Sequence, residues 1–367
     1  MSKITKALNI RADISNAHPA ATPIFQNSAF EAHSDYFYTR KNNPNIQEFE
    51  DAVKMLEGTE HGLATTTGMS AITLSLFLLK PNQTVLINKH IYGCTFKFFQ
   101  WYCSNYNLKL IVEDLTKKNI VDLPKADFVF FETPTNPFLF SIDIKKTSNY
   151  FKKKNKNCLI VVDNTWATPL FQNPCKLGAD ISLHSATKYL SGHSDVMGGI
   201  VLTNNEIICN KLRNIRFLTG TILDPNSAWL LRRSLHTLEV RLEKQSDTTK
   251  KIVKFLIGRI EVKKVYYPEV DGKQLTEYAT LVFLEVNKKI TAQYKSFCKH
   301  LKYFSTGTGM ACVTSMIAQP FTGSHASMED DEKREMGLDH SLIRLSFGME
   351  NADDLIADLK NAFDKVK

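Results

Sequence analysis

A regular alternation of short apolar runs with segments of helical periodicity is the feature that most constrains how this chain folds. The segments TVLIN (84–88), DFVFFET (127–133) and CLIVVDN (158–164) are apolar runs of strand length. Residues 46–57 instead space apolar side chains at helical intervals, just after Pro44 and just before a glycine. Strands that alternate with helices are typical of βαβ units, in which helices cover both faces of a mainly parallel sheet. We therefore predict an α/β protein.

The pattern continues along the chain and then changes after residue 204. We predict further helices at 69–79, 94–106 and 142–155, and further strands at 108–112, 181–187 and 198–203. A long helical pattern follows at 226–258. The last hundred residues mix predicted strands with helices, at 262–268, 279–286 and 342–348 for the strands and near 290–301 and 353–363 for the helices. We predict a large α/β domain over 46–240 and a smaller α+β domain over 241–367.

Composition and charge exclude several other classes. Hydrophobic residues make up 43% and charged residues 23% of the chain, which is ordinary for a globular protein. The longest apolar stretch, 71–79, is far shorter than the roughly 20 residues that span a bilayer, so no membrane segment is expected. The start of the chain shows no apolar secretory signal, and the seven cysteines form no CxxC pair. We expect a cytoplasmic protein with reduced thiols.

The net charge of +8 comes mostly from lysines that are spread along the chain, as at 152–156. No arginine-rich stripe, aromatic ladder or zinc-finger spacing accompanies these lysines. We expect a solvated lysine surface and no nucleic-acid partner.

Polar or aromatic side chains follow four of the predicted strands. Tyr92 follows the strand at 84–88, and Asn136 follows the one at 127–133. Asp163 closes the next apolar run, and Lys188 comes directly after 181–187. The carboxyl ends of parallel strands meet at one edge of a sheet, where ligands of such folds bind. We predict that these side chains share a site.

Each of these residues has a functional and an ordinary interpretation. A partly buried Lys188 would lose its charge easily and could attack a carbonyl group, or it could simply reach solvent. Asp163 needs a partner if it is buried, which could be a protonated ring nitrogen of a cofactor, a helix cap or a salt bridge. Tyr92 could stack on a flat heterocycle or belong to the core.

The run TTTGMS (65–70) precedes a predicted helix and resembles an anion site. Gly68 lets the backbone approach a ligand closely, and a helix N-terminus favours a phosphate. The run matches neither GxxxxGK[ST] nor GxGxxG, which disfavours a nucleoside triphosphate or a dinucleotide. Ser185 and Thr187 lie two apart on a strand, so their hydroxyls share a face. The alternative is a helix cap without any ligand.

A metal site is the rival interpretation for His184, His193 and Asp195. Metal ligands must converge at suitable spacing, whereas these three bracket a lysine and a turn. We expect no metal.

The run SATKYLSGHSD (185–195) resembles the lysine signature of the Cys/Met-metabolism enzymes that depend on pyridoxal 5'-phosphate (PLP). This family includes cystathionine γ-synthases, cystathionine γ- and β-lyases, methionine γ-lyases and O-acylhomoserine sulfhydrylases. Similar motifs occur in family order over almost the whole chain, at 38–40, 43–44, 67–72, 92–95, 132–137, 161–165 and 343–346. The resemblance implies the fold type I of PLP-dependent transferases, which is like that of aspartate aminotransferase and has a smaller C-terminal domain.

The resemblance also implies a role for each matching residue. Lys188 would join the PLP aldehyde as a Schiff base and shuttle protons, and Asp163 would hold the ring nitrogen protonated. Tyr92 would stack on the ring and assist proton transfer to the leaving group. The α-carboxylate of an amino-acid substrate would pair with Arg344 and Asn136. The phosphate would be held by backbone N–H groups of Gly68 and Met69, by hydroxyls of Ser185 and Thr187, and by Tyr38 and Arg40.

In the family, the residues that match Tyr38 and Arg40 come from a neighbouring subunit. The resemblance therefore implies an N-terminal arm, residues 1–45, that reaches across a catalytic dimer, and dimers that pair into a tetramer. The implied activity is γ-replacement or γ-elimination on sulfur amino acids or O-activated homoserine, of the cystathionine γ-synthase or γ-lyase type. A methionine γ-lyase or sulfhydrylase is the alternative. A rival from another class is a catalytically inactive scaffold or nucleic-acid-binding protein.

The chain departs from the family pattern at three places. In the segment 304–310, Thr308 and Gly309 stand where cystathionine-cleaving relatives carry a glutamate and a serine. The stretch 319–325 keeps a proline and a histidine but changes the residues between them, and 268–279 is shorter than in relatives. Cys94 matches a cysteine of methionine γ-lyases. These departures leave the exact reaction open between the alternatives above.

Overall fold

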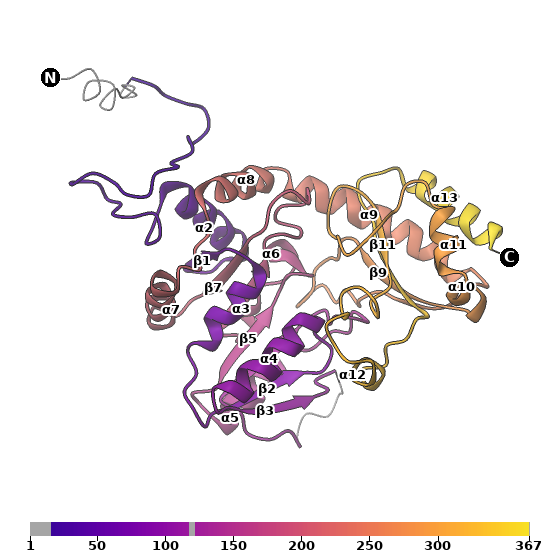
Figure 1. Cartoon of the computed structure of the whole chain (residues 1–367), viewed down its shortest axis with the longest axis horizontal. Coiled ribbons are helices and arrows are strands. Elements are labelled where there is room, and N and C mark those ends of the chain that lie inside the picture. The colour runs from indigo at the N-terminus through magenta and orange to yellow at the C-terminus, as the bar shows by residue number, and fades with distance from the viewer. Residues whose placement is uncertain (1–15, 117–121, 367) are drawn as a thin grey trace.

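A computed structural model provides the structure of the protein and describes residues 16–116 and 122–366 (Figure 1). Its strands form two separate sheets, one of seven strands and one of five. The strands of the larger sheet lie between residues 61 and 203 and those of the smaller one between residues 262 and 346 (Figure 1). This confirms the predicted α/β fold with a smaller α+β part. Helix α9 (Leu238–Ile257) starts just before residue 240 and packs on the second sheet. The predicted domain boundary at residue 240 stays a prediction.

The large sheet is mainly parallel, as predicted. Its strand order is β1 (His61–Thr65), β7 (Gly199–Thr203), β6 (Ile181–Ser185), β5 (Leu159–Asp163), β4 (Phe128–Glu132), β2 (Thr84–Asn88) and β3 (Lys109–Glu113). The strands from β6 to β3 pair in parallel, whereas β7 runs antiparallel to both of its neighbours. The carboxyl ends of β4, β5 and β6 therefore meet at one edge.

Helices cover both faces of this sheet because its central strands are apolar on both sides. In β4, Phe128 and Phe130 pack in one core with helix α4 (Gly93–Asn105), and Val129 and Phe131 pack in another with α5 (Ile144–Lys154). This is the period of two that a pleated strand imposes. The other helices of this region, two of them short, are α2 (Pro44–Glu57), α3 (Gly68–Leu76), α6 (Thr168–Phe171), the 3₁₀ turn η1 (Pro174–Leu177) and α7 (Glu206–Thr219).

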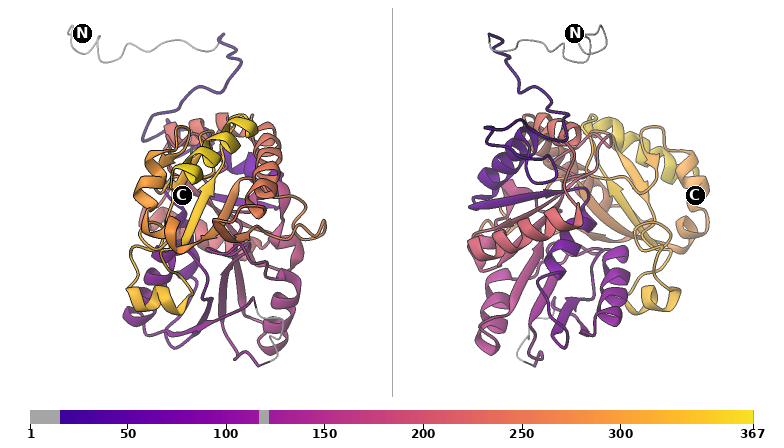
Figure 2. Two further views of the ribbon diagram at one scale, coloured as in Figure 1. Left: turned by 90° about the vertical axis from the view of Figure 1, so that its right-hand side faces the viewer. Right: turned by 60° about the vertical axis from the view of Figure 1, so that its left-hand side comes forward.

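Helix α2 begins and ends where the sequence indicates. The Asn43 side chain accepts a hydrogen bond from the Asn45 N–H, and Pro44 is the first helical residue. Gly58 ends the helix in the left-handed region, at φ 69°, which residues with a Cβ rarely adopt. The first of the described residues, before α2, extend away from the body of the protein (Figure 2).

The predicted pattern at 226–258 is two helices, α8 (Pro225–Leu235) and α9, which are separated at His236 and Thr237. The second sheet has the order β10 (Ser305–Thr306), β11 (Met316–Ala318), β12 (Leu342–Ser346), β9 (Leu281–Val286) and β8 (Val262–Tyr266). The remaining helices are α10 (Lys288–Ala292), α11 (Tyr294–Lys299), α12 (Asp330–Glu335) and α13 (Ala352–Lys365). Among residues 16–116 and 122–366, no helix combines the length and apolar character that crossing a bilayer requires.

Candidate active site

A cavity of about 280 Å³ opens where the carboxyl ends of β4, β5 and β6 meet. The segments that follow these strands line it, together with the start of α3, the residue before α4 and two loops of the C-terminal region. The predicted site residues that the structure brings together here are Gly68, Met69, Tyr92, Asn136, Asp163, Ser185, Thr187 and Lys188. Segments more than a hundred residues apart thus converge on one space, as the strand-end argument predicts.

Lys188 lies in a tight turn shortly after β6 and is half-buried. Its backbone N–H donates to the Ser185 carbonyl at 3.1 Å. Burial lowers the pKa of the Lys188 amine, and the positive charge of Arg344 lowers it further. A larger fraction of this amine is therefore neutral, which is the form that attacks an aldehyde.

Asp163 is the last residue of β5 and is also half-buried. Its Oδ1 accepts a hydrogen bond from the Thr165 N–H at 2.9 Å. Burial raises the pKa of Asp163, while hydrogen bonds from Thr165 and the charge of His184 lower it. A buried carboxylate that lines a cavity is best stabilised by a cationic ligand group, so Asp163 suits a protonated ring nitrogen.

The start of α3 forms a cradle for an anion. The Thr67 side chain caps the helix by accepting from the Ser70 N–H at 3.0 Å. A Cβ on Gly68 would come within 2.8 Å of the Ser185 Cβ, so only glycine lets the helix start approach β6 this closely. Free N–H groups at the helix start and the hydroxyls of Ser185 and Thr187 make a donor set that fits a phosphate.

Tyr92 stands at the N-terminus of α4 and contacts Glu132, which is not among the predicted site residues. Its backbone N–H donates to Glu132 Oε1 at 2.6 Å, and Trp166 Nε1 donates to Glu132 Oε2 at 3.2 Å. Burial raises the pKa of the Tyr92 phenol, so it stays protonated and can donate a proton. Burial, and then Asp163, raises the pKa of Glu132. A signal for Glu132 existed, because it closes an apolar strand just as Asp163 does.

Arg344 lies behind the cavity in β12 and is only 2% exposed. Its Nη2 donates to the carbonyls of Thr308 and Gly309, at 3.1 Å each. Its Nε has no hydrogen-bond partner among the described residues. Burial lowers the pKa of Arg344 to about 10, so the guanidinium stays charged at neutral pH. A buried guanidinium with an unused N–H can accept a carboxylate once the loop 308–310 makes room.

Tyr38 and Arg40, like Arg344, are predicted site residues that do not line this cavity. Arg40 Nη1 donates to the Phe217 carbonyl at 2.6 Å, and its guanidinium lies 4.3 Å from the centre of the Phe217 ring. Tyr38 pairs with Ala29 in an isolated antiparallel bridge. Within one chain the arm therefore packs on α7. The part of the predicted arm before residue 16 lies outside the described residues.

No group of three or more His, Cys, Asp or Glu side chains is arranged to hold a metal ion in the described part of the chain. His184 instead contacts Glu57, and His193 Nδ1 lies 2.6 Å from the carbonyl of Ser191.

The cavity offers an amine, a carboxylic acid, an anion cradle and an aromatic ring. This donor set fits PLP, which carries an aldehyde, a ring nitrogen and a phosphate.

The comparisons with known proteins agree with this geometry. Residues 6–364 match the family model described as Cys/Met metabolism PLP-dependent enzyme. Cystathionine beta-lyase of Lactococcus lactis subsp. cremoris is 36% identical, and the match covers 94% of each chain. L-methionine gamma-lyase of Fusobacterium nucleatum subsp. polymorphum is 33% identical, with 94% of each chain covered. The crystal structure of cystathionine gamma synthase from Xanthomonas oryzae pv. oryzae, in complex with aminoacrylate and cysteine, superimposes with a TM-score of 0.90. It is 32% identical, and the match covers 94% of this chain and 93% of that one.

The fold and the site define a PLP-dependent enzyme of fold type I. The protein belongs to the Cys/Met metabolism family of these enzymes. The resemblance inferred from the lysine signature and the expected cofactor are thereby confirmed.

Proposed function

We propose that the protein catalyses γ-replacement or γ-elimination on a sulfur amino acid or an O-activated homoserine, in the manner of a cystathionine γ-synthase or γ-lyase. The observation that carries the proposal is the convergence of Lys188, Asp163 and Tyr92 on one cavity beside an anion cradle. When PLP is bound, its ring takes up electrons from the α-carbon of the substrate. Membership in a family that contains such lyases and synthases supports this reaction class.

The residues of the chain would divide the proton transfers between them. The neutral amine of Lys188 can take a proton from the substrate α-carbon and return it later, because its pKa is lowered by burial. The Tyr92 phenol stays protonated and can give its proton to the departing γ-substituent. Asp163 keeps a positive charge on the cofactor ring, and it does not itself move a proton. Each acid–base step of this kind contributes about 10²–10⁴-fold.

Substrate orientation would depend on Arg344 and Asn136. The Nε of Arg344 is buried without a partner among the described residues, and a substrate α-carboxylate would satisfy it. The carbonyls of Thr308 and Gly309 now occupy the neighbouring Nη2, so the loop 308–310 would shift when the carboxylate binds.

A panel of amino acids tests the proposed reaction. We expect turnover of cystathionine to 2-oxobutanoate, or formation of cystathionine from an O-acylhomoserine and cysteine, when each substrate is incubated with PLP-loaded protein. The Lys188→Ala variant serves as the matched blank. Release of pyruvate from cystathionine would show cleavage on the β side, the reaction in the name of the Lactococcus relative, and would contradict the γ assignment.

A methionine γ-lyase type of reaction is the second candidate, and one observation favours it. The carboxylates that line the described cavity are Glu132 and Asp163, and hydrogen bonds engage both. The wall formed by Thr308, Met310 and residues 323–324 offers no acid to the distal ammonium group of cystathionine. A small uncharged γ-substituent suits this wall better. Rapid release of 2-oxobutanoate from methionine, with little from cystathionine, would reverse the order of the two candidates.

We also propose that a second copy of the chain completes each site, as a catalytic dimer that pairs further into a tetramer. A second cavity of about 640 Å³ adjoins the first and shares Thr67, Thr187, Lys188 and Met310 with it. Such a space next to the anion cradle suits the arm of a partner. In this division of the chain, residues 1–45 are the arm, and 46–240 and 241–367 are the two domains.

Mixing two inactive variants tests the shared site. Arg40→Ala and Lys188→Ala dimers should each lose most activity, while co-expression should restore about a quarter of wild-type turnover. When the two variant chains pair at random, half of the dimers contain one chain of each variant. In each of these dimers, one of the two sites has both Arg40 and Lys188 intact. Arg213→Ala, a change on the surface of α7, is the matched control for Arg40 and should keep full activity. If the mixture stays inactive while Arg40→Ala alone is impaired, Arg40 acts within its own chain.

We further propose that the enzyme works in the cytoplasm. The seven cysteines are all free in the structure, as expected of a protein in a reducing compartment.

A further inference from the structure

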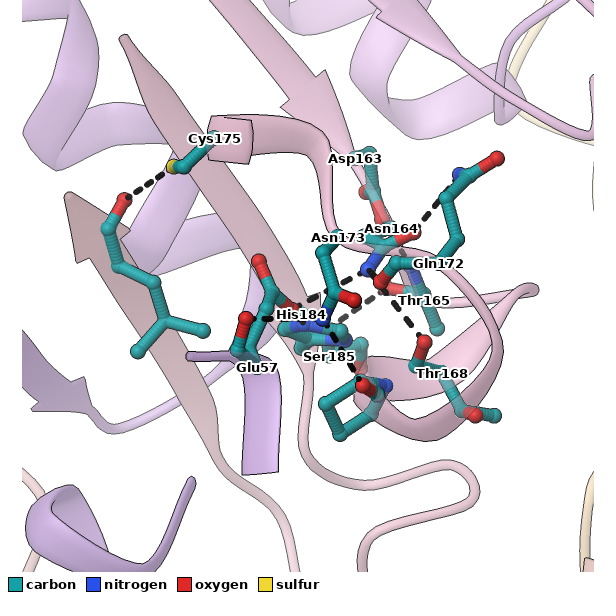
Figure 3. A network of polar contacts seen from close by, with 12 residues as sticks. Glu57, Asp163, Asn164, Thr165, Thr168, Gln172, Asn173, Cys175, His184 and Ser185 are labelled. Carbon is teal, nitrogen blue, oxygen red and sulfur yellow. Dashed lines mark hydrogen bonds and ion pairs between the residues drawn. The ribbon is translucent and has the colours of Figure 1, made fainter. Parts of the chain in front are cut away.

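A buried polar network joins the end of α2, β6 and the segment that follows Asp163 (Figure 3). Its centre is the carboxylate of Glu57, at the end of α2, which is fully buried. Glu57 Oε2 lies 2.5 Å from Nε2 of His184, which is 2% exposed, and accepts a hydrogen bond from Asn164 Nδ2 at 3.1 Å. Glu57 Oε1 has no partner among the described residues. The reaction roles assigned above use neither Glu57 nor His184.

The network is built into the strand ends that carry the active site. Asn164 follows Asp163 in the chain, and its backbone N–H donates to the Leu183 carbonyl at 2.8 Å. Its side chain is held by Glu57 on one side and by Gln172, whose Nε2 donates to Asn164 Oδ1 at 2.8 Å, on the other. These hydrogen bonds of Asn164 fix the turn after β5 and so restrict where the Asp163 carboxylate can point.

The charge of the network also reaches Asp163. β5 and β6 are neighbouring strands, and Asp163 lies opposite Leu183, the residue before His184. A carboxylate that is buried as fully as Glu57 needs a cationic partner, and His184 is its nearest one. A positive His184 lowers the pKa of Asp163, against the effect of burial. On the opposite side, Glu132 lies in register with Asp163, and the two acids disfavour each other's charge.

Two other titratable side chains, those of Cys175 and Lys176, lie near Glu57. The Cys175 thiol packs close to Glu57, and burial together with that charge raises its pKa, so it stays neutral. The Lys176 ammonium lies beside Gly58, which follows Glu57 in the chain.

We propose that Glu57 and His184 are positioning residues that keep Asp163 ionised and aimed at the ring nitrogen of PLP. The proposal rests on the assignment of Asp163 to that nitrogen. Glu57 fixes the His184 ring beside the end of β5, and a positive charge on that ring supports the negative charge of Asp163. Neither side chain touches substrate or cofactor.

The variant Glu57→Gln tests the proposal, since it keeps an acceptor for Asn164 and removes the charge. We expect the PLP-loaded variant to show two changes relative to wild type. The acid limb of its cofactor absorbance, recorded against pH, should move to higher pH by about one unit. The dissociation constant of PLP, measured by equilibrium dialysis, should rise about tenfold. His184→Gln should reproduce both changes, and the double variant should be no worse than either single one.

Asn173→Ala is the matched control, because Asn173 Nδ2 donates to the Glu57 backbone carbonyl at 2.8 Å and carries no charge. It should lower the melting temperature and leave the acid limb in place. The conservative Glu57→Asp keeps the charge and should restore the wild-type limb. If all of these variants alter only the melting temperature, or fail to fold alike, the network is structural and the proposal is overturned. If Asp163→Asn itself leaves PLP binding and absorbance unchanged, the assignment of Asp163 fails instead.

Discussion

Lys188→Ala is expected to abolish the Schiff-base absorbance of the PLP-loaded protein and to lower kcat by about 10³-fold or more. The amine of Lys188 lies in the cavity and is the one that burial makes available as a neutral nucleophile. Without it, PLP can bind through its phosphate and ring nitrogen but has no lysine to join. Absorbance spectra and turnover on the best substrate of the panel measure the two effects.

Lys152→Ala is the control for this change. Lys152 lies on α5, pairs with Asp180 at 2.8 Å and does not line the cavity. A surface ion pair of this kind contributes little to stability, so colour and turnover should stay near wild type. If borohydride still joins PLP covalently to the Lys188→Ala protein, another amine holds the cofactor.

Asp163→Asn is expected to keep the fold and to lower turnover by about 10²–10⁴-fold, because a neutral amide cannot stabilise a positive ring nitrogen. The expected pH dependence follows from the raised pKa of Asp163. The ionised form binds the ring, so PLP affinity in wild type should weaken as the pH falls through that pKa. The Asp163→Asn variant should not show this loss of PLP affinity at low pH. Equilibrium dialysis of PLP across pH measures the effect.

Asp180→Asn is the matched control for Asp163→Asn. Asp180 precedes β6 at the amino end of the strand and accepts a hydrogen bond from the Ile160 N–H at 2.8 Å. Its replacement should cost stability and leave the pH dependence of PLP binding unchanged. An Asp163→Asn enzyme with wild-type turnover would remove the acid from the account of the site.

The main elements of the fold could be predicted because their signals are local. β2 lies at the predicted residues, and β4, β5 and β6 lie within the predicted apolar runs. Pro44 and Gly58 mark the ends of α2 through their own backbone preferences. A parallel sheet then brings its strand ends together, which is why Asp163, Lys188 and Tyr92 could be expected in one place.

The elements that were missed depend on partners far along the chain. β1, with the sequence HGLAT, becomes a strand by pairing with β7 and carries no long apolar run of its own. β10 and β11 have only two and three residues, too few for any pattern. The break between α8 and α9 has neither proline nor glycine to announce it.

The same limit applies to the site. Glu132 and Trp166 are joined by a hydrogen bond between segments that only the fold brings together. The contact of Glu57 with His184 spans more than a hundred residues. The position of Arg40 in an assembly depends on a second chain, which no pattern within one chain describes.

Borohydride trapping tests the central claim most directly. PLP-loaded protein would be reduced, digested and analysed by peptide mass spectrometry, which locates the residue that is covalently joined to the cofactor. We predict that the added mass falls on Lys188, in one copy per chain. A label on any other lysine, or no label at saturating PLP, would contradict the account.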